Sequence, residues 1–210
     1  NLKNWQFINS APGGAELKSF DDSNWRSLTI PHDWAIEGDF DINHDAQVIT
    51  VSEDKDTKPR LRTGRTGALP SAGIGWYRTS FNINDTSKKQ QIYFDGAMSN
   101  AKIYVNGKYI GERPYGYSPF YFDISDFVEK GNNKIAVRLE NFENQSRWYT
   151  GGGLYREVYL IETNPLHIST WGIQITTSKI AKNNTSINIS TNLVGKEVVT
   201  VVQKIKDDKS

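Results

Sequence analysis

The sequence predicts an all-β protein with the architecture of a β-sandwich or jelly roll. Short runs in which apolar and polar residues alternate recur along the chain, separated by Gly, Asn, Asp and Pro. Asn106-Gly107 stands between two such runs, and this pair is a strong hairpin signal because a type I′ turn needs positive φ at both central residues. No window has the periodicity of a long amphipathic helix. Short, regularly spaced strands of this kind are typical of sandwiches and jelly rolls.

The predicted strands are short segments of alternating character. In residues 134–139, Ile135, Val137 and Leu139 share one face, and the intervening residues are Lys, Ala and Arg. This alternation indicates a strand of an antiparallel sheet that is buried on one face. In chain order, the strands expected before residue 164 are 76–81, 91–95, 101–105, 108–111, 120–124, 134–139 and 157–161.

One long segment interrupts this pattern. Residues 43–67 are polar, charged and poor in strand signals, and they include the charged run Glu53–Arg60. A solvated, mobile loop is the expected structure. A partner-binding loop is the alternative.

A second interruption falls at Asn164-Pro165. Three strand-like runs follow it, at residues 168–175, 185–191 and 197–204. These runs are too few to bury a core of their own. The sequence therefore predicts one complete domain over residues 1–164 and, over residues 165–210, the start of a second small β domain that is incomplete.

Composition narrows the functional classes. The formal net charge is +1 and the lysines are scattered, so no basic stripe indicates nucleic-acid binding. No apolar run approaches the roughly 18 residues of a membrane span. The absence of cysteine excludes disulfides, thiolate catalysis and Cys-ligated metals but leaves the compartment open. Aromatic residues make up 12% of the chain, which suits a β-rich core and surfaces that stack on sugar rings.

Three polar or glycine-rich motifs invite a functional interpretation. His32-Asp33 has the residue types of a catalytic triad, but neighbours in sequence do not make one, and Pro31–Trp34 is interpreted as a structural corner. Gly151–Gly153 lack the strand-then-helix context of a phosphate-binding loop. They are predicted to form a tight turn where the backbone approaches another segment closely.

The third motif is the acidic pair Asp21-Asp22. Short acidic side chains cap turns by accepting backbone N–H bonds, and this is the expected role. A structural Ca²⁺ is the alternative, because hard oxygen ligands suit that ion. No other cofactor is expected.

Five groups of motifs follow one another over about residues 1–162, and together they resemble the N-terminal domain of glycoside hydrolase family 2, the β-galactosidase and β-glucuronidase family. Pro31–Trp34 with Gly73–Arg78 is most similar to the β-galactosidase branch of Bacteroides-type bacteria. The segment after Pro165 resembles the start of that family's immunoglobulin-like second domain. The motif groups are Phe20–Trp25 with Leu28–Trp34; Gly67–Pro70 with Gly73–Arg78; Phe94–Gly96 with Ala101–Gly107; Gly116–Phe120 with Phe122–Ile124 and Gly131–Val137; and Arg147–Arg156.

The resemblance implies a galactose-binding-domain-like jelly roll followed by part of an immunoglobulin-like β-sandwich. In the family, the acid/base and the nucleophile of the retaining mechanism lie in a later (β/α)₈ barrel, which these 210 residues do not include. The expected function is therefore that of a non-catalytic, sugar-binding scaffold domain of a β-galactosidase-like hydrolase. A β-glucuronide or a β-mannoside remains open as the substrate of the whole enzyme.

Two other classes of protein remain as alternatives. A free-standing carbohydrate-binding module fits the aromatic content, and an adhesion sandwich fits the fold alone. The expected partners are a carbohydrate and the downstream catalytic barrel, with no nucleic acid and no membrane, and family members often associate as homo-oligomers. The resemblance to Bacteroides-type sequences implies that the protein is exported, for example to the periplasm of a bacterium. The cytoplasm is the alternative.

The candidate substrate-binding residues are Asn141, Glu143, Arg147 and Trp148. They belong to a loop that follows a strand and combines amide, carboxylate and guanidinium groups with aromatic rings, which is the mixture that binds sugars. In family members, a loop at this position reaches over the barrel mouth. This sequence departs from the family pattern, because no Asp stands at the matching place and Ala72 or Ile74 replaces a polar residue. The alternative role of Arg147 and Trp148 is packing between domains.

Overall fold

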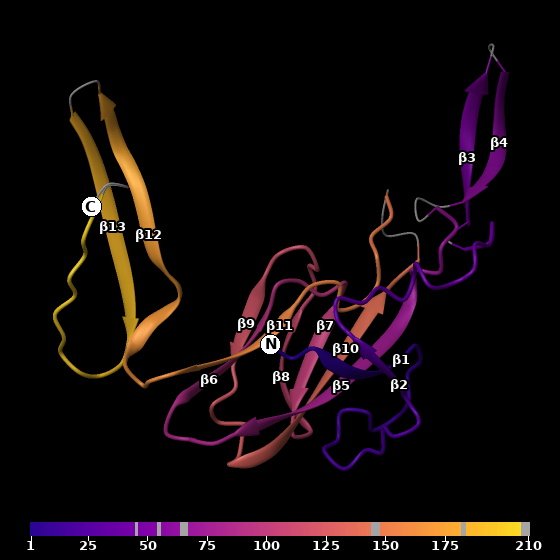
Figure 1. Cartoon of the computed structure of the whole chain (residues 1–210). Coiled ribbons are helices and arrows are strands. Elements are labelled where there is room, and N and C mark those ends of the chain that lie inside the picture. The colour runs from indigo at the N-terminus through magenta and orange to yellow at the C-terminus, as the bar shows by residue number, and fades with distance from the viewer. Residues whose placement is uncertain (45, 54–55, 64–66, 144–147, 182–183, 207–210) are drawn as a thin grey trace. The chain divides into compact units, whose positions relative to one another are not determined.

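The computed structural model of the protein describes residues 1–44, 46–53, 56–63, 67–143, 148–181 and 184–206. It divides the chain into two units, Asn1–Glu162 and Thr163–Ser210, which we describe separately. Every regular element in the described residues is a strand, as the sequence predicts (Figure 1). No helix among these residues is long and apolar enough to cross a membrane.

The first unit contains two sheets that share a core. The larger sheet has six strands, and each pair for which the register is known is antiparallel. The smaller sheet has three strands. In spatial order, the larger sheet consists of β2 (Arg26–Thr29), β1 (Asn4–Ile8), β5 (Gly73–Ile83), β10 (Gly131–Asn141), β7 (Ala101–Val105) and β8 (Lys108–Arg113), and the smaller of β11 (Val158–Thr163), β6 (Lys89–Phe94) and β9 (Phe120–Asp123).

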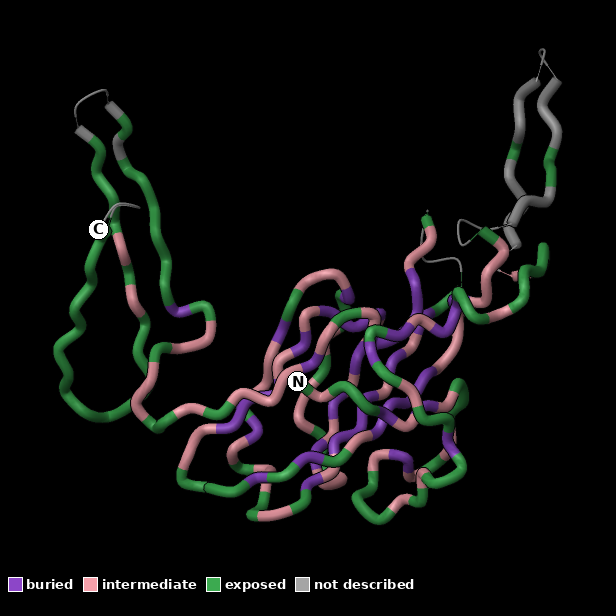
Figure 2. The backbone as a smooth tube through the Cα atoms, in the orientation of Figure 1, coloured by how far each residue is buried: buried purple, intermediate pink, exposed green. Residues whose placement is uncertain are grey.

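The core joins the two sheets. Ile135, Val137 and Leu139 of β10 are fully buried, which confirms the face predicted for this strand. They belong to one apolar cluster with Phe94 of the smaller sheet and Tyr77 of β5. Figure 2 shows the buried residues concentrated in the strands of this unit. Burial of these side chains is the main favourable contribution to a fold of this size.

The opposite face of β5 and β10 is also partly covered. Trp76 and Ala136 project there and form a second buried cluster with Ala15 and Trp25. Phe20 packs against the edge of this cluster. The segment around residues 15–25 is therefore fastened to the outside of the larger sheet.

The segment predicted to be a mobile loop contains a hairpin instead. Strands β3 (Ala46–Glu53) and β4 (Asp56–Thr63) pair in antiparallel register from Ala46↔Thr63 to Glu53↔Asp56. The charges of β4 and its Pro59 concealed the strand in the sequence. A two-stranded ribbon has an open edge on each strand, and a proline is tolerated at such an edge because no ladder hydrogen bond is required of it.

The second unit contains one long hairpin, β12 (His167–Ala181) paired with β13 (Asn184–Val194). The strands predicted at 168–175 and 185–191 lie within it. The strand predicted at 197–204 is wrong, because residues 197–206 form no regular element. Their β-branched side chains favour extended backbone, but a strand also requires a neighbouring strand with which to pair.

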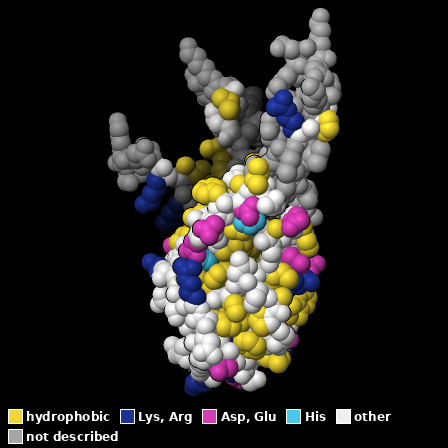
Figure 3. All heavy atoms as spheres, turned by 90° about the vertical axis from the view of Figure 1, so that its right-hand side faces the viewer, with side chains coloured by type: hydrophobic (Ala, Val, Ile, Leu, Met, Phe, Trp, Pro, Cys, Tyr) yellow, Lys and Arg dark blue, Asp and Glu magenta, His cyan; other side chains and the backbone are white. Residues whose placement is uncertain are grey.

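Charges of both signs are interspersed on the surface. On the face shown in Figure 3, acidic and basic side chains occur singly or in small groups among hydrophobic and uncharged polar ones. This distribution agrees with the near-zero net charge.

Candidate functional site

The predicted site lies where β10 ends, and its first residue is an anchor. The side chain of Asn141 is buried, with 8% of the residue exposed. Its Nδ2 donates to the carbonyl oxygens of Ser71 at 3.0 Å and Gly151 at 2.8 Å, and its Oδ1 accepts from Ser99 Oγ at 2.7 Å. One amide therefore joins three segments that are far apart in sequence, and both of its N–H groups are used.

The Ser99 segment is fastened to the end of β10 by further hydrogen bonds. The backbone N–H of Glu140 donates to Ser99 O at 2.9 Å, and Asn100 Nδ2 donates to Glu140 O at 2.9 Å. Met98 and Gly153 exchange two backbone hydrogen bonds of 3.0 and 2.9 Å. The polar groups named here are thus satisfied within the protein.

The corner Pro31–Trp34 packs against the glycine motif. His32 N–H donates to Leu154 O at 2.9 Å, Trp34 N–H donates to Gly152 O at 2.8 Å, and Gly152 N–H donates to Asp33 Oδ1 at 2.9 Å. A Cβ on Gly152 would lie 2.5 Å from the Trp34 ring. The structural interpretation of both motifs is confirmed, because the corner and the close backbone approach are parts of one contact.

Asp33 also holds the segment that leads out of the predicted loop. Tyr149 donates its hydroxyl to Asp33 Oδ2 at 2.6 Å. Partial burial raises the pKa of Tyr149, and the hydrogen bond to the Asp33 carboxylate raises it further. The phenol therefore stays protonated at neutral pH and fixes the backbone directly after Trp148.

His32 is part of a hydrogen-bond network and not of a catalytic triad. Its Nδ1 lies 2.6 Å from the Tyr77 hydroxyl, and its Nε2 lies 3.2 Å from Glu37 Oε2. Burial raises the pKa of Tyr77 well above its usual value, so this phenol stays protonated at neutral pH. Arg26 binds the same carboxylate, with Nη2 to Oε1 at 2.9 Å, and these hydrogen bonds lower the pKa of Glu37 to about 2.

Four aromatic side chains, two of them exposed and two half-buried, gather beside the anchor. Trp148, 59% exposed, donates its Nε1–H to the Tyr117 hydroxyl at 3.0 Å. The Tyr117 ring forms T-shaped contacts with the rings of Tyr115 and Tyr155. The distances between ring centroids are 5.6 Å and 6.5 Å respectively. We call Tyr115, Tyr117, Trp148 and Tyr155 the aromatic rim. Rings that present an apolar face beside hydrogen-bonding groups are suited to binding sugars.

The structure separates the predicted site residues by environment. Asn141 is buried at the anchor, whereas Glu143 and Trp148 are exposed. Arg147 lies outside the described residues. Tyr115, Tyr117 and Tyr155 were not predicted for the site. The available signal was Tyr115-Gly116-Tyr117, since its spacing places an exposed ring next to a half-buried one.

The acidic pair has two separate roles. Asp21 Oδ1 accepts the N–H of Ser23 at 3.0 Å, which is the predicted turn. Asp22 Oδ2 accepts from Arg78 Nε at 2.8 Å and from Lys134 Nζ at 3.2 Å. Within the part of the chain that the structure describes, no group of three or more His, Cys, Asp or Glu side chains is placed to hold a metal ion.

The fold and the rim together define a two-sheet antiparallel sandwich with aromatic and amide groups at the end of a central strand. Comparison with known proteins then identifies it: residues 24–164 match the model of the glycosyl hydrolases family 2, sugar binding domain. The chain belongs to this family.

Relatives of known sequence and structure agree with this membership. A β-galactosidase of Bacteroides ovatus is 38% identical over 97% of this chain, and one of Thermoanaerobacter pseudethanolicus is 34% identical over 60% of it. A solved β-glycosidase of Bacteroides vulgatus matches 93% of the chain with a TM-score of 0.79 and 35% identity. The chain spans only 23%, 18% and 24% of these three proteins respectively.

Proposed function

We propose that this chain is a non-catalytic sugar-binding and scaffold domain of a β-galactoside hydrolase, whose catalytic carboxylates lie in another part of the protein. The similarity to β-galactosidases supports the class of reaction. The chain matches only a small share of their length, which supports the assignment of catalysis to another part of the protein. The observation that carries a direct part in sugar binding is the Asn141 anchor beside the aromatic rim.

In this proposal, Asn141 is a positioning residue. The loop that starts after it leaves a strand that pairs with β5 along its whole length, from Gly131↔Ile83 to Asn141↔Gly73. A rigid base of this kind limits the positions open to a described residue that follows it, such as Glu143, so less entropy is lost when a ligand binds. Glu143 and Arg147 are then the groups for sugar hydroxyls, and Trp148 is the surface for the apolar face of the ring.

The test is kinetic and uses the full-length enzyme with a β-galactoside substrate. We expect Trp148→Ala and Arg147→Ala to lower kcat/KM by about five- to thirtyfold, because loss of a sugar contact of about 1–2 kcal/mol has this effect. Tyr109→Ala is the matched control, because Tyr109 is an exposed aromatic residue at the far end of the β7–β8 hairpin from Arg113. If both variants fold and have unchanged kinetics, the sugar contact is rejected. Packing between domains is then the remaining role of Arg147 and Trp148.

Calorimetry separates the proposal from a free-standing binding module. Millimolar or tighter binding of galactose or lactose by this chain alone indicates a module that binds sugar without a barrel. An absence of heat under the same conditions supports a rim that completes a pocket formed mainly by other residues of the protein.

A further inference from the structure

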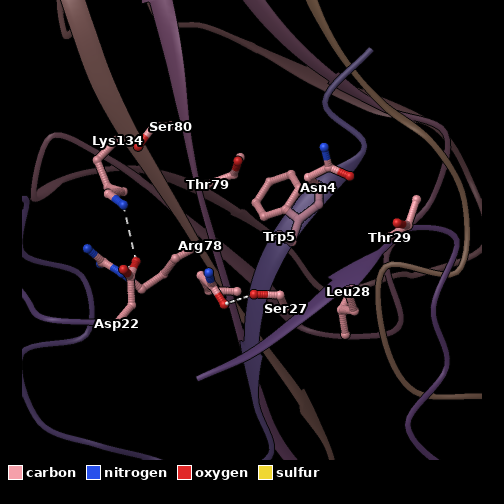
Figure 4. Close-up of a pocket in the computed structure, with 11 residues that line it drawn as sticks. Asn4, Trp5, Asp22, Ser27, Leu28, Thr29, Arg78, Thr79, Ser80 and Lys134 are labelled. Atoms are coloured by element: carbon pink, nitrogen blue, oxygen red, sulfur yellow. Dashed lines mark hydrogen bonds and ion pairs between the residues drawn. The ribbon is translucent and has the colours of Figure 1, made fainter. Parts of the chain in front are cut away.

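A polar groove lies on the outer face of the larger sheet, and it shares no residue with the rim (Figure 4). It encloses about 430 Å³. The strand register places the groove on four adjacent strands, through the pairs Thr29↔Asn4, Ser27↔Gln6, Gln6↔Arg78 and Ser80↔Lys134. The residues that line it are Asn4, Trp5, Gln6, Asp22, Ser27, Leu28, Thr29, Arg78, Thr79, Ser80 and Lys134.

The groove exists because two neighbouring strands separate. β1 pairs with β5 only where Gln6–Ile8 meet Trp76–Arg78, whereas β10 accompanies β5 along its whole length. Beyond Arg78, the side of β5 that faces β1 has no ladder partner in the described residues. Thr79 and Ser80 therefore line an opening in the sheet, where alternate backbone N–H and C=O groups supply additional hydrogen-bonding capacity.

One wall of the groove is held rigidly by a buried arginine. Arg78 is fully buried, and its guanidinium donates to the carbonyl oxygens of Ala15 and Leu17 as well as to Asp22. The Phe20 ring lies 5.3 Å from the guanidinium carbon. An ordinary solvated sheet face has no such wall, and a wall fixed in advance reduces the entropy that a ligand loses on binding.

The charges in the groove do not balance. Its lining contains one carboxylate, Asp22, and two cations, Arg78 and Lys134. The donors of Arg78 are directed to Asp22 and to backbone carbonyls. Lys134 donates one bond to Asp22, and an ammonium has three donors. Lys134 thus supplies an excess positive charge at a partly exposed position inside a concave surface, where the field of a charge is strengthened.

We propose that this groove binds a saccharide that carries an anionic group, either a carboxylate or a sulfate ester. Lys134 pairs with the anionic group. The hydroxyl and amide side chains of Asn4, Ser27 and Ser80 bind the sugar hydroxyls. The site is separate from the rim and does not depend on the function proposed above.

The experiment is calorimetric titration of the chain with three matched probes: methyl β-D-glucuronide, methyl β-D-galactoside 6-sulfate and the neutral methyl β-D-galactoside. We expect one or both anionic probes to bind at least tenfold more tightly than the neutral one, and the stronger of the two identifies the anionic group. Lys134→Gln should abolish this preference, because a hydrogen bond to a charged partner changes affinity by about tenfold or more.

A matched control and a second variant make the result decisive. Lys108→Gln removes an equivalent charge at the exposed turn of the β7–β8 hairpin, and it should leave the binding of every probe unchanged. Ser80→Ala, which removes one hydroxyl with little effect on packing, should weaken the binding of each anionic probe that binds the parent protein. The proposal would be overturned if no probe bound at millimolar concentration, or if the neutral probe bound as tightly as the anionic ones. It would also be overturned if Lys134→Gln kept the preference for the anionic probes, or if inorganic sulfate bound as tightly as the saccharides.

Discussion

At the scale of single residues, the polar groups of this domain act as fasteners between distant segments. Asn141 joins three backbone segments, and Asp33 accepts bonds from Gly152 and Tyr149. Such roles explain why residue types that suggest catalysis, such as His32-Asp33, have structural functions here. A buried polar group that loses its partner costs about 1–3 kcal/mol, so each of these bonds constrains the sequence strongly.

The Glu37 carboxylate predicts a pH dependence of stability. Hydrogen bonds from Arg26 and His32 lower its pKa from 4.5 to about 2 in the folded protein. A lowered carboxylate pKa stabilises the folded state above pH 4.5, and this contribution disappears as the pH falls from 4.5 towards 2. Glu37→Gln should therefore lower the Tm at pH 7 and have a much smaller effect near pH 2, as measured by thermal unfolding.

The control for this prediction is Asp39→Asn, a change at a nearby exposed carboxylate. It should leave the Tm close to that of the parent protein at both pH values. If Glu37→Gln lowered the Tm equally at pH 7 and pH 2, the network around His32 would not stabilise the fold through the charge of Glu37.

At the scale of elements, the β7–β8 hairpin shows how local signals and tertiary contacts agree. Asn106 and Gly107 have φ values of 51° and 83°, as the predicted type I′ turn requires. The Asn106 side chain also donates to Phe127 O at 3.0 Å and accepts from Lys134 N–H at 3.0 Å. The turn is therefore specified both by its own backbone geometry and by its attachment to β10.

This geometry predicts the effect of a Cβ in the turn. Gly107→Ala should destabilise the chain by about 1 kcal/mol or more in denaturant unfolding, because alanine is strained at positive φ. The space around Gly107 is sufficient, since the atom nearest to a new Cβ lies at 3.5 Å. Gly13→Ala is the control, because nothing lies within 4 Å and its φ is not positive. Equal effects of the two changes would contradict a backbone origin.

Other elements show where local patterns mislead. The β3–β4 ribbon was hidden by its charges, and residues 197–206 have the composition of a strand without forming one. A strand depends on its neighbour in the ladder, which composition does not reveal.

At the scale of the whole molecule, the two units differ in how much apolar surface they bury. In the second unit, Ile173 and Ile175 lie on the same face of the ribbon as their cross-strand partners Thr191 and Ile189, and Ile175 is 66% exposed. Isolated two-stranded hairpins are marginally stable in water. Figure 2 shows that most of this unit is exposed.

Hydrogen exchange should reveal this difference. Backbone amides of β10, which is paired on both sides and buried in the core, should be protected far more strongly than those of β12 and β13. Mass spectrometry of the exchanging chain measures both regions in one sample, so the first unit serves as the internal control. Equal protection would contradict the difference in burial between β10 and the described residues of β12 and β13.

The sequence by itself determined the all-β class, the strands β5–β11 and the Asn106-Gly107 turn, because alternation and turn chemistry are local properties, and its motif series indicated the family. The strands β1 and β2 of the larger sheet were not predicted from the sequence. Only the tertiary structure decided that Asn141 is an anchor, that Tyr115, Tyr117 and Tyr155 stand beside Trp148, and that β1 separates from β5 to open a charged groove. Each of these features depends on segments far apart in the chain, and their contacts are set by strand register and packing rather than by local sequence.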